Sequence, residues 1–234
     1  MKVLLILMCF SQALFASSMN IDLGQTNTVY NRFSIPKSDA DKISVPSEGA
    51  LTSFRLTGYF DLASKNQIYF LIAPLETDSQ FLSNKNFTFN DSSFFANTNT
   101  RVIYKFNSYR LGYLWTWEKA RLKYWFGAVA KIRDADIKVS QGSLSDSYNN
   151  IGLVPLANFG FNWNLWSGVS LFSHTDALGS SQGSAYDSQV EIKLSSQDYG
   201  ISMGKRILGG GADNEKVYTF AQFDTYYIRF TSYF

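Results

Sequence analysis

The sequence predicts an all-β fold, an antiparallel transmembrane β-barrel of about ten strands, with eight or twelve strands as the alternatives. Three observations carry this prediction. An apolar N-terminal segment has the form of an export signal, and apolar residues in the rest of the chain recur with a period of two. The connections between the period-two segments alternate in length, and the chain ends in an aromatic residue.

The composition of the 234-residue chain excludes several classes of protein. The formal net charge is +2 and the cations are interspersed with acids, whereas nucleic-acid binding needs clustered positive charge. One cysteine and 45% hydrophobic residues argue against both a disulfide scaffold and a disordered chain. Charged residues make up 17%, below the ~25% of ordinary soluble domains, and 17% are aromatic. This balance favours an amphipathic environment.

The first 18 residues are predicted to be a secretory signal peptide. Lys2 precedes a short apolar run, and small residues surround the expected cleavage point after Ser18. Residues 19–234 then form a single outer-membrane β-barrel domain. The apolar run is shorter than the ~20 residues of a membrane-spanning helix, which argues against an N-terminal anchor. Because Cys9 lies in the signal, neither disulfides nor thiol chemistry are expected in the mature chain.

Ten segments of the mature chain show the alternation of β-strands with one apolar face. Within 120–139, for example, every even position from 122 to 132 is apolar, and the residues between them include cations. A soluble β-sandwich with its apolar faces inside is the alternative interpretation. The expected strands are 20–33, 50–61, 66–75, 99–117, 120–139, 151–165, 168–177, 183–194, 199–208 and 215–234.

The expected connections favour the barrel over the sandwich because they alternate in length. Outer-membrane barrels have short turns at the periplasmic end and longer loops outside, so the alternation predicts that both termini are periplasmic. The connections 62–65, 118–119, 166–167 and 195–198 are short, and 34–49, 76–98, 140–150, 178–182 and 209–214 are medium or long.

The expected strand 99–117 changes its apolar face part-way along. Apolar residues within 102–106 occupy even positions, whereas those within 109–117 occupy odd positions. A β-bulge near 107–108 would shift the faces in this way, and a turn there would give eleven strands. Because eleven strands would break the alternation of the connections, we expect one long bulged strand.

The last strand has the form of a membrane-assembly signal. Phe234 is the final residue, and Phe230, Ile228 and Tyr226 precede it on the same face, with Ser232 as a polar interruption. This resembles the terminal strand that barrel-assembly machinery recognises in Gram-negative bacteria. The expected partners are outer-membrane lipids, periplasmic chaperones and that machinery, and the protein is expected to be a monomer. A soluble edge strand that ends in Phe by chance is the alternative.

Four segments of the second half of the chain resemble a family of uncharacterised small bacterial outer-membrane β-barrels. They are 131–137, 152–156, 182–187, and 204–213 continuing into 217–220. In that family the position of Ser184 is usually Arg and that of Gly209 is usually Glu, so an ion pair that relatives make there is not expected in this chain. The resemblance covers roughly residues 100–234. It implies an outer-membrane location and a barrel fold, without an activity.

On the expected strand map these four segments meet at the extracellular mouth. One interpretation is a rim site for an anionic or polar ligand, and the other is an ion-paired collar that ties the bases of the loops together. The collar is favoured, and Arg206 and Asp187 from adjacent strands are its expected pair. The candidate rim cluster is Arg133, Asp134, Asp136, Asp187, Arg206 and Asp213.

His174, the one histidine, is the candidate for acyl-hydrolase or acyl-transferase chemistry. Ser170 and Asp176 share its face of the expected strand. Same-face residues four apart in a strand lie roughly 13 Å apart, however, beyond the ~3 Å that proton transfer needs. We therefore predict no catalytic residue, and an outer-membrane lipid-modifying enzyme that uses His174 is the alternative function.

No metal site and no cofactor are predicted. One histidine and no mature cysteine leave only carboxylates as strong ligands, and Asp134, Asp136 and Asp187 match no calcium-loop spacing.

The inward-facing positions of the expected barrel carry more cations than anions, so an open lumen would prefer anions. Ten strands enclose little space, however, and large inward residues would fill much of it. These charges are interpreted mainly as a salt-bridged plug. The expected function is that of a multi-pass outer-membrane barrel of structural, surface-interaction or narrow-channel (porin-like) type. The inward candidates are Arg55, Asp61, Arg110, Lys123, Lys131, Arg133, Asp187, Glu191, Lys193, Arg206 and Arg229.

Overall fold

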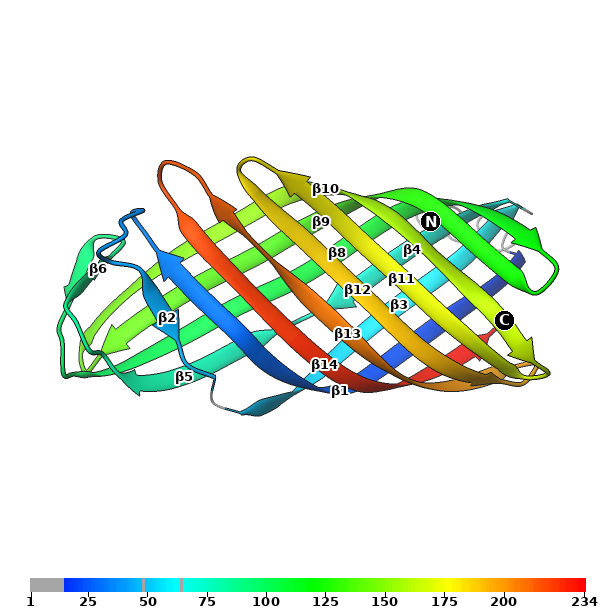
Figure 1. The fold of residues 1–234 in the computed structure, drawn as a ribbon, viewed down its shortest axis with the longest axis horizontal. Helices are drawn as coiled ribbons and strands as arrows, with labels where there is room; N and C mark the ends of the chain where they lie inside the picture. The colour runs from blue at the N-terminus through cyan, green and yellow to red at the C-terminus, as the bar shows by residue number, and fades with distance from the viewer. Residues whose placement is uncertain (1–14, 48, 64) are drawn as a thin grey trace, which may run out of the picture.

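The chain forms a closed antiparallel β-barrel (Figure 1) in the computed structural model, which describes residues 15–234 apart from 48 and 64. Sequence neighbours pair around the ring, and the last strand pairs back onto the first. Ten barrel strands, with β4 and β5 counted as one, form the wall, which confirms the predicted fold class and strand number. They are β1 (Phe15–Ser34), β3 (Ala50–Ala63), β4 (Asn66–Ala73) continued by β5 (Glu76–Leu82), β8 (Asn99–Lys119), β9 (Leu122–Gln141), β10 (Leu144–Trp166), β11 (Val169–Ser180), β12 (Gly183–Ser195), β13 (Tyr199–Asp213) and β14 (Tyr218–Tyr233).

The two ends of the barrel differ in their connections. One end, called the turn end, holds both described termini and the tight turns 120–121 and 167–168. There Ala120 and Gly168 adopt positive φ angles of 53° and 74°. The opposite end, called the loop end, carries the two long connections 35–49 and 83–98, as the sequence predicts, but its connections at 142–143 and 181–182 are tight turns and not the predicted longer loops. Most of the predicted signal peptide, residues 1–18, lies outside the described residues, and its cleavage stays a prediction.

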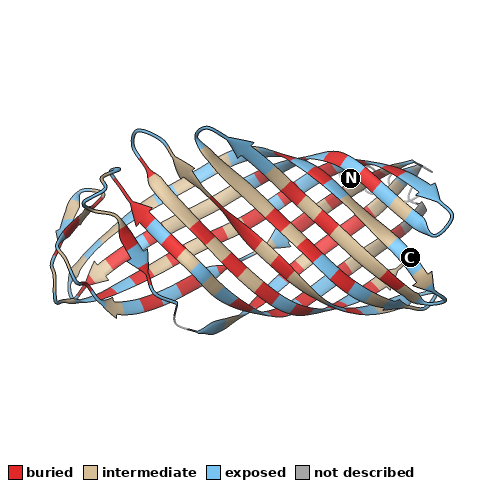
Figure 2. Cartoon of the chain, viewed as in Figure 1, coloured by how far each residue is buried: buried red, intermediate tan, exposed pale blue. Residues whose placement is uncertain are grey.

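Apolar and polar side chains alternate along the barrel strands, and the apolar ones point outward. The alternation of buried and exposed residues gives the wall a checkerboard pattern (Figure 2). A belt of exposed apolar side chains surrounds the barrel and includes Ile21, Leu23, Leu111, Trp115, Phe126, Ile132, Phe159, Trp163, Val190, Ile192, Ile201, Ile228 and Phe230. A soluble sandwich has the reverse arrangement, so this interpretation is wrong. The described residues contain no helix long and apolar enough to cross a membrane.

β8 is one long strand, but the predicted bulge near 107–108 is wrong. Its register with β9 is continuous from Arg101 opposite Ser140 to Lys119 opposite Leu122. Even positions point inward along the whole strand. The apolar face switches because the interior changes, from polar at mid-barrel to apolar near the loop end.

An apolar cluster fills the loop end of the barrel and explains this switch. It combines the loop-end parts of the barrel strands with β2 (Ile43–Val45) and with the hairpin formed by β6 (Phe87–Phe89) and β7 (Ser92–Phe94). We call β2 and this hairpin the cap. The aromatic rings of Phe87 and Phe94 stack with centroids 5.2 Å apart. The buried members of the cluster include Phe33, Ile35, Ile43, Val45, Phe87, Phe89, Phe94, Val102, Tyr104, Phe106, Ile137, Val217 and Phe223.

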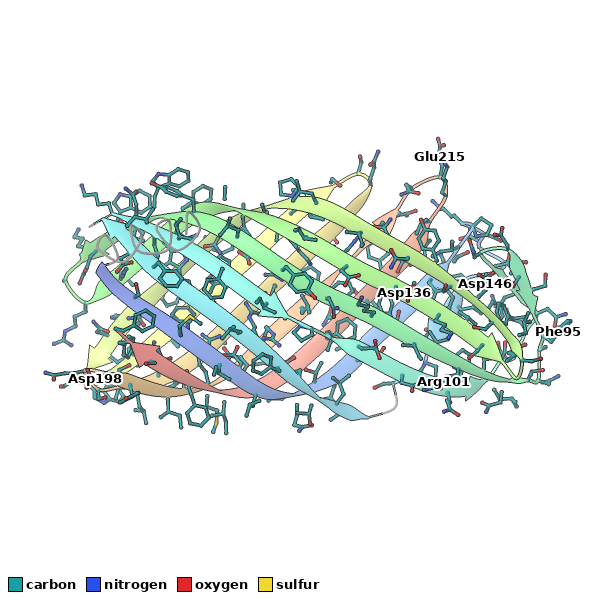
Figure 3. All side chains as sticks on the ribbon, turned by 180° about the vertical axis from the view of Figure 1, so that it is seen from behind. Phe95, Arg101, Asp136, Asp146, Asp198 and Glu215 are labelled. Carbon is teal, nitrogen blue, oxygen red and sulfur yellow. The ribbon has the colours of Figure 1, made fainter. Side chains whose placement is uncertain are left out.

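The connection predicted as a long loop at 140–150 is instead an extended hairpin. β9 runs to Gln141 and β10 starts at Leu144, so only residues 142–143 form the turn. Gly142 accommodates the turn with a φ of 57°. The hairpin carries Asp146 close to the loop end, near Phe95 and far from Asp198 at the turn end (Figure 3). The barrel therefore extends further at the loop end than its connections alone would require, because β9 and β10 continue there as strands beside the two long connections.

β10 continues far beyond its pairing with β11. The last paired residues are Ala157 and Ala177, yet β10 extends back to Leu144 with β9 as its only strand partner among the described residues. Pro155 lies just past this point and has no N–H to offer a neighbouring strand. From Pro155 toward the loop end, the β9–β10 hairpin and the β11–β12 hairpin diverge, and their tips lie well apart (Figure 1). We call this interruption of the wall the β10–β11 gap.

Candidate functional site

The middle of the lumen is filled by ion pairs between opposite walls. Arg55 on β3 lies 2.9 Å from a carboxylate oxygen of Asp187 on β12. Arg110 on β8 reaches the same carboxylate at 2.8 Å and Asp176 on β11 at 2.5 Å. Tyr69 donates a hydrogen bond to Asp176 at 3.2 Å. All five side chains are buried, so each charge is compensated where water is excluded.

A second group of ion pairs lies around the junction of the first and last strands. Arg229 on β14 donates two hydrogen bonds to Asp22 on β1, at 2.6 and 2.9 Å, and lies 3.0 Å from a carboxylate oxygen of Glu191 on β12. Tyr227 donates to Glu191 at 2.7 Å. We call the two groups together the lumen network. Five of the predicted inward charges, Arg55, Arg110, Asp187, Glu191 and Arg229, are thus ion-paired, and a plugged lumen stays a prediction.

The buried charges of the described lumen do not balance. Four buried carboxylates, Asp22, Asp176, Asp187 and Glu191, face five buried cations, Arg55, Arg110, Lys131, Arg206 and Arg229. Arg206 lies 3.7 Å from Asp22. Among these five cations, Lys131 is the one with no carboxylate within ion-pair distance. It is only 2% exposed, and its ammonium lies 5.2 Å from the ring centre of Phe106.

His174 lies in the lumen network and not at an open site. Its Nδ1 is 3.2 Å from the hydroxyl of Tyr59, which comes from the opposite wall, and its Nε2 is 2.9 Å from the amide nitrogen of Asn158. The nearest carboxylate oxygen, on Asp176, is 3.5 Å away. Ser170 shares its face, as predicted, but forms no hydrogen bond with it in the described structure. Both ring nitrogens are thus taken up by the buried side chains of Tyr59 and Asn158, and no serine or threonine hydroxyl is among the described hydrogen-bond partners of His174.

A cavity of about 220 Å³ lies in the loop-end half of the barrel, beside the β10–β11 gap. Its lining joins both edges of the β10–β11 gap to the inner faces of β9 and β12–β14. Apolar side chains, two cations, and hydroxyl and amide groups line it, and the described lining contains no Asp or Glu. We call it the loop-end cavity. Its lining includes Tyr104, Phe106, Lys131, Arg133, Ile137, Tyr148, Asn150, Val154, Leu178, Ser180, Gln182, Ala185, Val217 and Thr219.

The residues of the predicted rim cluster do not converge on one site. Asp187 and Arg206 lie deep in the lumen, and the expected pair between them is absent from the described ion pairs, because Asp187 instead bridges Arg55 and Arg110. The expected placement of these two residues at the mouth is therefore wrong. In the register between β12 and β13, Arg206 faces Gln189 and not Asp187.

The other four residues of the rim cluster lie nearer the loop end, and three of them have separate partners there. Arg133 contacts the side-chain oxygen of Asn150 and lines the loop-end cavity. Asp134 points outward and pairs with Lys105 at 2.7 Å. Asp213 pairs with Lys37 at 2.6 Å and so ties β13 to the connection 35–49. Asp136 also lies on the outer wall (Figure 3), and one of its carboxylate oxygens has no hydrogen-bond partner.

The C-terminal strand presents its predicted assembly residues to the outside. Tyr226, Ile228 and Phe230 are all exposed on the outer face of β14. Phe234 is exposed beyond the end of β14, where its backbone exchanges two hydrogen bonds with Ser17, at 2.8 and 3.0 Å. Recognition by assembly machinery stays a prediction.

Sequence patterns do not reveal the roles of two buried charged residues of the interior, Asp22 and Lys131. Asp22 alternates with the apolar residues Ile21 and Leu23 in the first strand, so the same parity rule identifies it as an inward acid. The sequence predicts that Lys131 points inward, but nothing in it distinguishes this lysine from the paired cations. No group of His, Cys, Asp and Glu that could hold a metal is found in the described part of the chain.

Comparisons with known proteins find similarity only among solved structures. No protein-family model matches the sequence, and no curated protein matches it. The translocator domain of the autotransporter NalP from Neisseria meningitidis aligns with 100% of this chain and 94% of its own, with a TM-score of 0.46 and 6% identity. Ail, the attachment invasion locus protein of Yersinia pestis, solved with the heparin analogue sucrose octasulfate, aligns over 92% and 98%, with a TM-score of 0.42 and 10% identity.

A third neighbour is an outer-membrane channel from Pseudomonas putida F1. It aligns over 96% of this chain and 98% of its own, with a TM-score of 0.43 and 8% identity. At such low identities and TM-scores, no activity carries over from these neighbours to this chain.

Proposed function

We propose that this chain is an integral protein of the bacterial outer membrane, crossing it with ten strands. The apolar belt supports this, because so many exposed aliphatic and aromatic side chains on a closed barrel are stable in lipid and not in water. The difference between the turn end and the loop end supports an orientation with the termini in the periplasm. The proposal includes export through a cleaved signal peptide and a monomeric state in contact with outer-membrane lipids, after delivery by periplasmic chaperones and the assembly machinery.

We further propose that the barrel is closed along its axis, and that its role is structural or one of surface interaction. The contact between Tyr59 and His174 carries this proposal. These residues belong to β3 and β11, on opposite walls, and their side chains meet at 3.2 Å in the middle of the lumen. The buried ion pairs fill the same level, and the apolar cluster closes the loop end above it. A narrow channel is therefore the less suitable function.

The alternative of a lipid-modifying enzyme finds no support around His174. Catalysis of acyl transfer needs a nucleophile within hydrogen-bond reach of the base and an open position for the substrate. The described partners of His174 are a tyrosine and an asparagine, together with the nearby carboxylate of Asp176, all buried. The barrel belongs, on this proposal, with the small outer-membrane barrels that the second half of its sequence resembles.

Fractionation of cells that express the full chain tests the membrane location. The protein should sediment with the outer membrane and resist extraction with alkaline carbonate. It should also migrate differently on gels before and after heating, since closed barrels resist detergent until heated. Recovery in the soluble periplasmic fraction would contradict the proposal.

A further inference from the structure

We propose that the loop-end cavity binds an amphipathic anion, an alkyl chain with a carboxylate or phosphate head, which enters sideways through the β10–β11 gap and is held by Lys131 and Arg133. The inference goes beyond the proposed function, because a barrel closed along its axis needs no such site.

The charge of the cavity indicates an anionic ligand. Lys131 is buried and has no carboxylate partner, and the Nε of Arg133 is a buried donor without a hydrogen-bond partner. Both side chains line the cavity, and the described lining contains no acid. An ammonium group without a counter-ion is costly to bury, and the other buried cations of the lumen lie near carboxylates. A negatively charged head group of a ligand supplies the counter-ion that the protein does not provide for these two cations.

The rest of the lining indicates an alkyl chain. Phe106, Val154 and Leu178 line the cavity together with other apolar residues, and the two latter residues come from the two edges of the β10–β11 gap. The volume of about 220 Å³ suits a single chain and is small for a whole two-chain lipid. Binding sites for small molecules typically combine such an apolar lining with a few polar groups.

The position of the gap connects the cavity to the bilayer. On the outer face of β9, the last apolar residue is Ile132, and the charged Asp134 follows it. Lys131 and Arg133 therefore lie on the inner face at the level where the apolar belt ends, which is the level of lipid headgroups. Ile151 and Leu153 on β10, beside the gap, are 68% and 73% exposed. An amphipathic anion in the outer leaflet thus has its head at the height of the two cations.

The unpaired edge of β10 is a second reason for lateral access. Backbone N–H and C=O groups without partners are costly within the hydrocarbon of a bilayer. The unpaired edge of β10 is therefore expected to face water or a polar ligand, and it marks an opening in the barrel wall. A second copy of this chain that extends the sheet at β10 is the competing occupant. The absence of acids from the cavity favours the anion, because sheet extension needs no buried cations.

The test uses the full chain refolded into nanodiscs of phosphatidylcholine, titrated calorimetrically with dodecyl phosphate. We expect saturable binding of one molecule, weakened about tenfold or more in Lys131→Met and in Arg133→Gln, because each variant removes a charge-assisted hydrogen bond. Lys131→Met should remain folded, since it leaves no partner unpaired. The matched control is Lys138→Met, an exposed lysine on the outer face of β9, which should bind as the wild type does.

Three further probes separate the contributions of head, chain and route. Dodecyl maltoside carries the chain without the charge and inorganic phosphate the charge without the chain, so both should bind at least tenfold more weakly. Leu178→Trp fills the gap side of the cavity and should abolish binding. If phosphatidylglycerol in the nanodisc competes with dodecyl phosphate, the natural source of the anion is a bilayer lipid, and if it does not, a free single-chain amphipath.

Two results would overturn the proposal. One is equal affinity of wild type and Lys131→Met for dodecyl phosphate, which would mean that the cations do not hold the head. The other is a protein that sediments as a dimer and binds no dodecyl phosphate, which would show that a second copy covers the edge of β10.

Discussion

Arg229 donates two hydrogen bonds to the carboxylate of Asp22, directly across the seam where the last strand of the barrel meets the first. The two residues are 207 positions apart in the sequence, so this pair forms only when the ring closes. The bidentate geometry fixes the register of β14 on β1, because a shift of β14 by one residue would turn Arg229 out of the lumen and leave Asp22 inside without its partner. Closure of the barrel and burial of these charges are thus one event.

The first prediction concerns this pair. Arg229→Met should lower the free energy of unfolding by about 3–5 kcal/mol, because it leaves Asp22 and Glu191 buried without their cation. Urea unfolding of the refolded protein in detergent measures the change. The matched control is Arg101→Met, which removes an exposed pair with Asp78 and should cost about 0–1 kcal/mol. Equal losses in the two variants would contradict a stabilising role of the lumen network.

The second prediction concerns the partner of Asp187. A double-mutant cycle between Arg110→Met and Asp187→Asn should give a coupling energy above about 1 kcal/mol, since the two groups are 2.8 Å apart. The same cycle with Arg206→Met should give less than about 0.5 kcal/mol, because no ion pair joins Arg206 to Asp187 among the described contacts. Stronger coupling to Arg206 would restore the collar at the mouth that the sequence predicts.

The third prediction concerns assembly. Deletion of Phe234 should reduce the amount of folded protein in the outer membrane several-fold, because the terminal aromatic residue is part of the predicted assembly signal and its backbone pairs with Ser17. Heat-modifiable gel migration of membrane fractions measures the folded amount. The control is deletion of Glu215, an exposed residue of the connection between β13 and β14. If the two deletions assemble equally well, the terminal signature is incidental.

The fourth prediction concerns pH and the cap. Burial alone would raise the pKa of Asp146, but hydrogen bonds from Asn90 and from the Asp91 amide, both at 3.1 Å, lower the pKa on balance. A carboxyl group with a lowered pKa in the folded state adds stability above its ordinary pKa of about 4 and loses it as the pH falls through the lowered value. The hairpin β6–β7 should therefore loosen below about pH 4.

Hydrogen exchange of residues 87–94 at pH 3 and pH 6 checks this prediction, after correction for the intrinsic rates. Asp146→Asn should show faster exchange at pH 6 and little change between the two pH values. A wild-type hairpin equally protected at both pH values would contradict the role given to Asp146.

The sequence predicts the barrel strands well, because the alternation of apolar and polar residues along them has a simple physical cause. A barrel in lipid has two chemically distinct faces, so parity alone assigns Tyr226, Ile228 and Phe230 to the outside and Arg55 and Arg110 to the lumen. The same rule misleads at β8. Inward Val102 and Phe106 are apolar because the cap buries them, and an inside that changes from polar to apolar imitates a bulge.

Partners across the lumen are beyond the reach of sequence patterns. Neighbouring strands suggest Arg206 for Asp187, but the side chains of a filled lumen extend to the opposite wall, and their heights depend on the stagger of the whole barrel. The uncompensated Lys131 becomes visible only once the other cations have been assigned their acids. The gap above Pro155 likewise depends on where pairing stops, which is a property of two strands together.

Planar-bilayer recording of the refolded full chain tests the central claim, that the lumen is closed along its axis, most directly. The same proteoliposomes must first show heat-modifiable migration, so that the inserted barrel is known to be folded. We predict no stepwise current above that of protein-free membranes in 1 M KCl, because Tyr59 and His174 join opposite walls within the ion-paired lumen. Regular, long-lived single-channel steps from the wild-type protein would contradict the closed lumen.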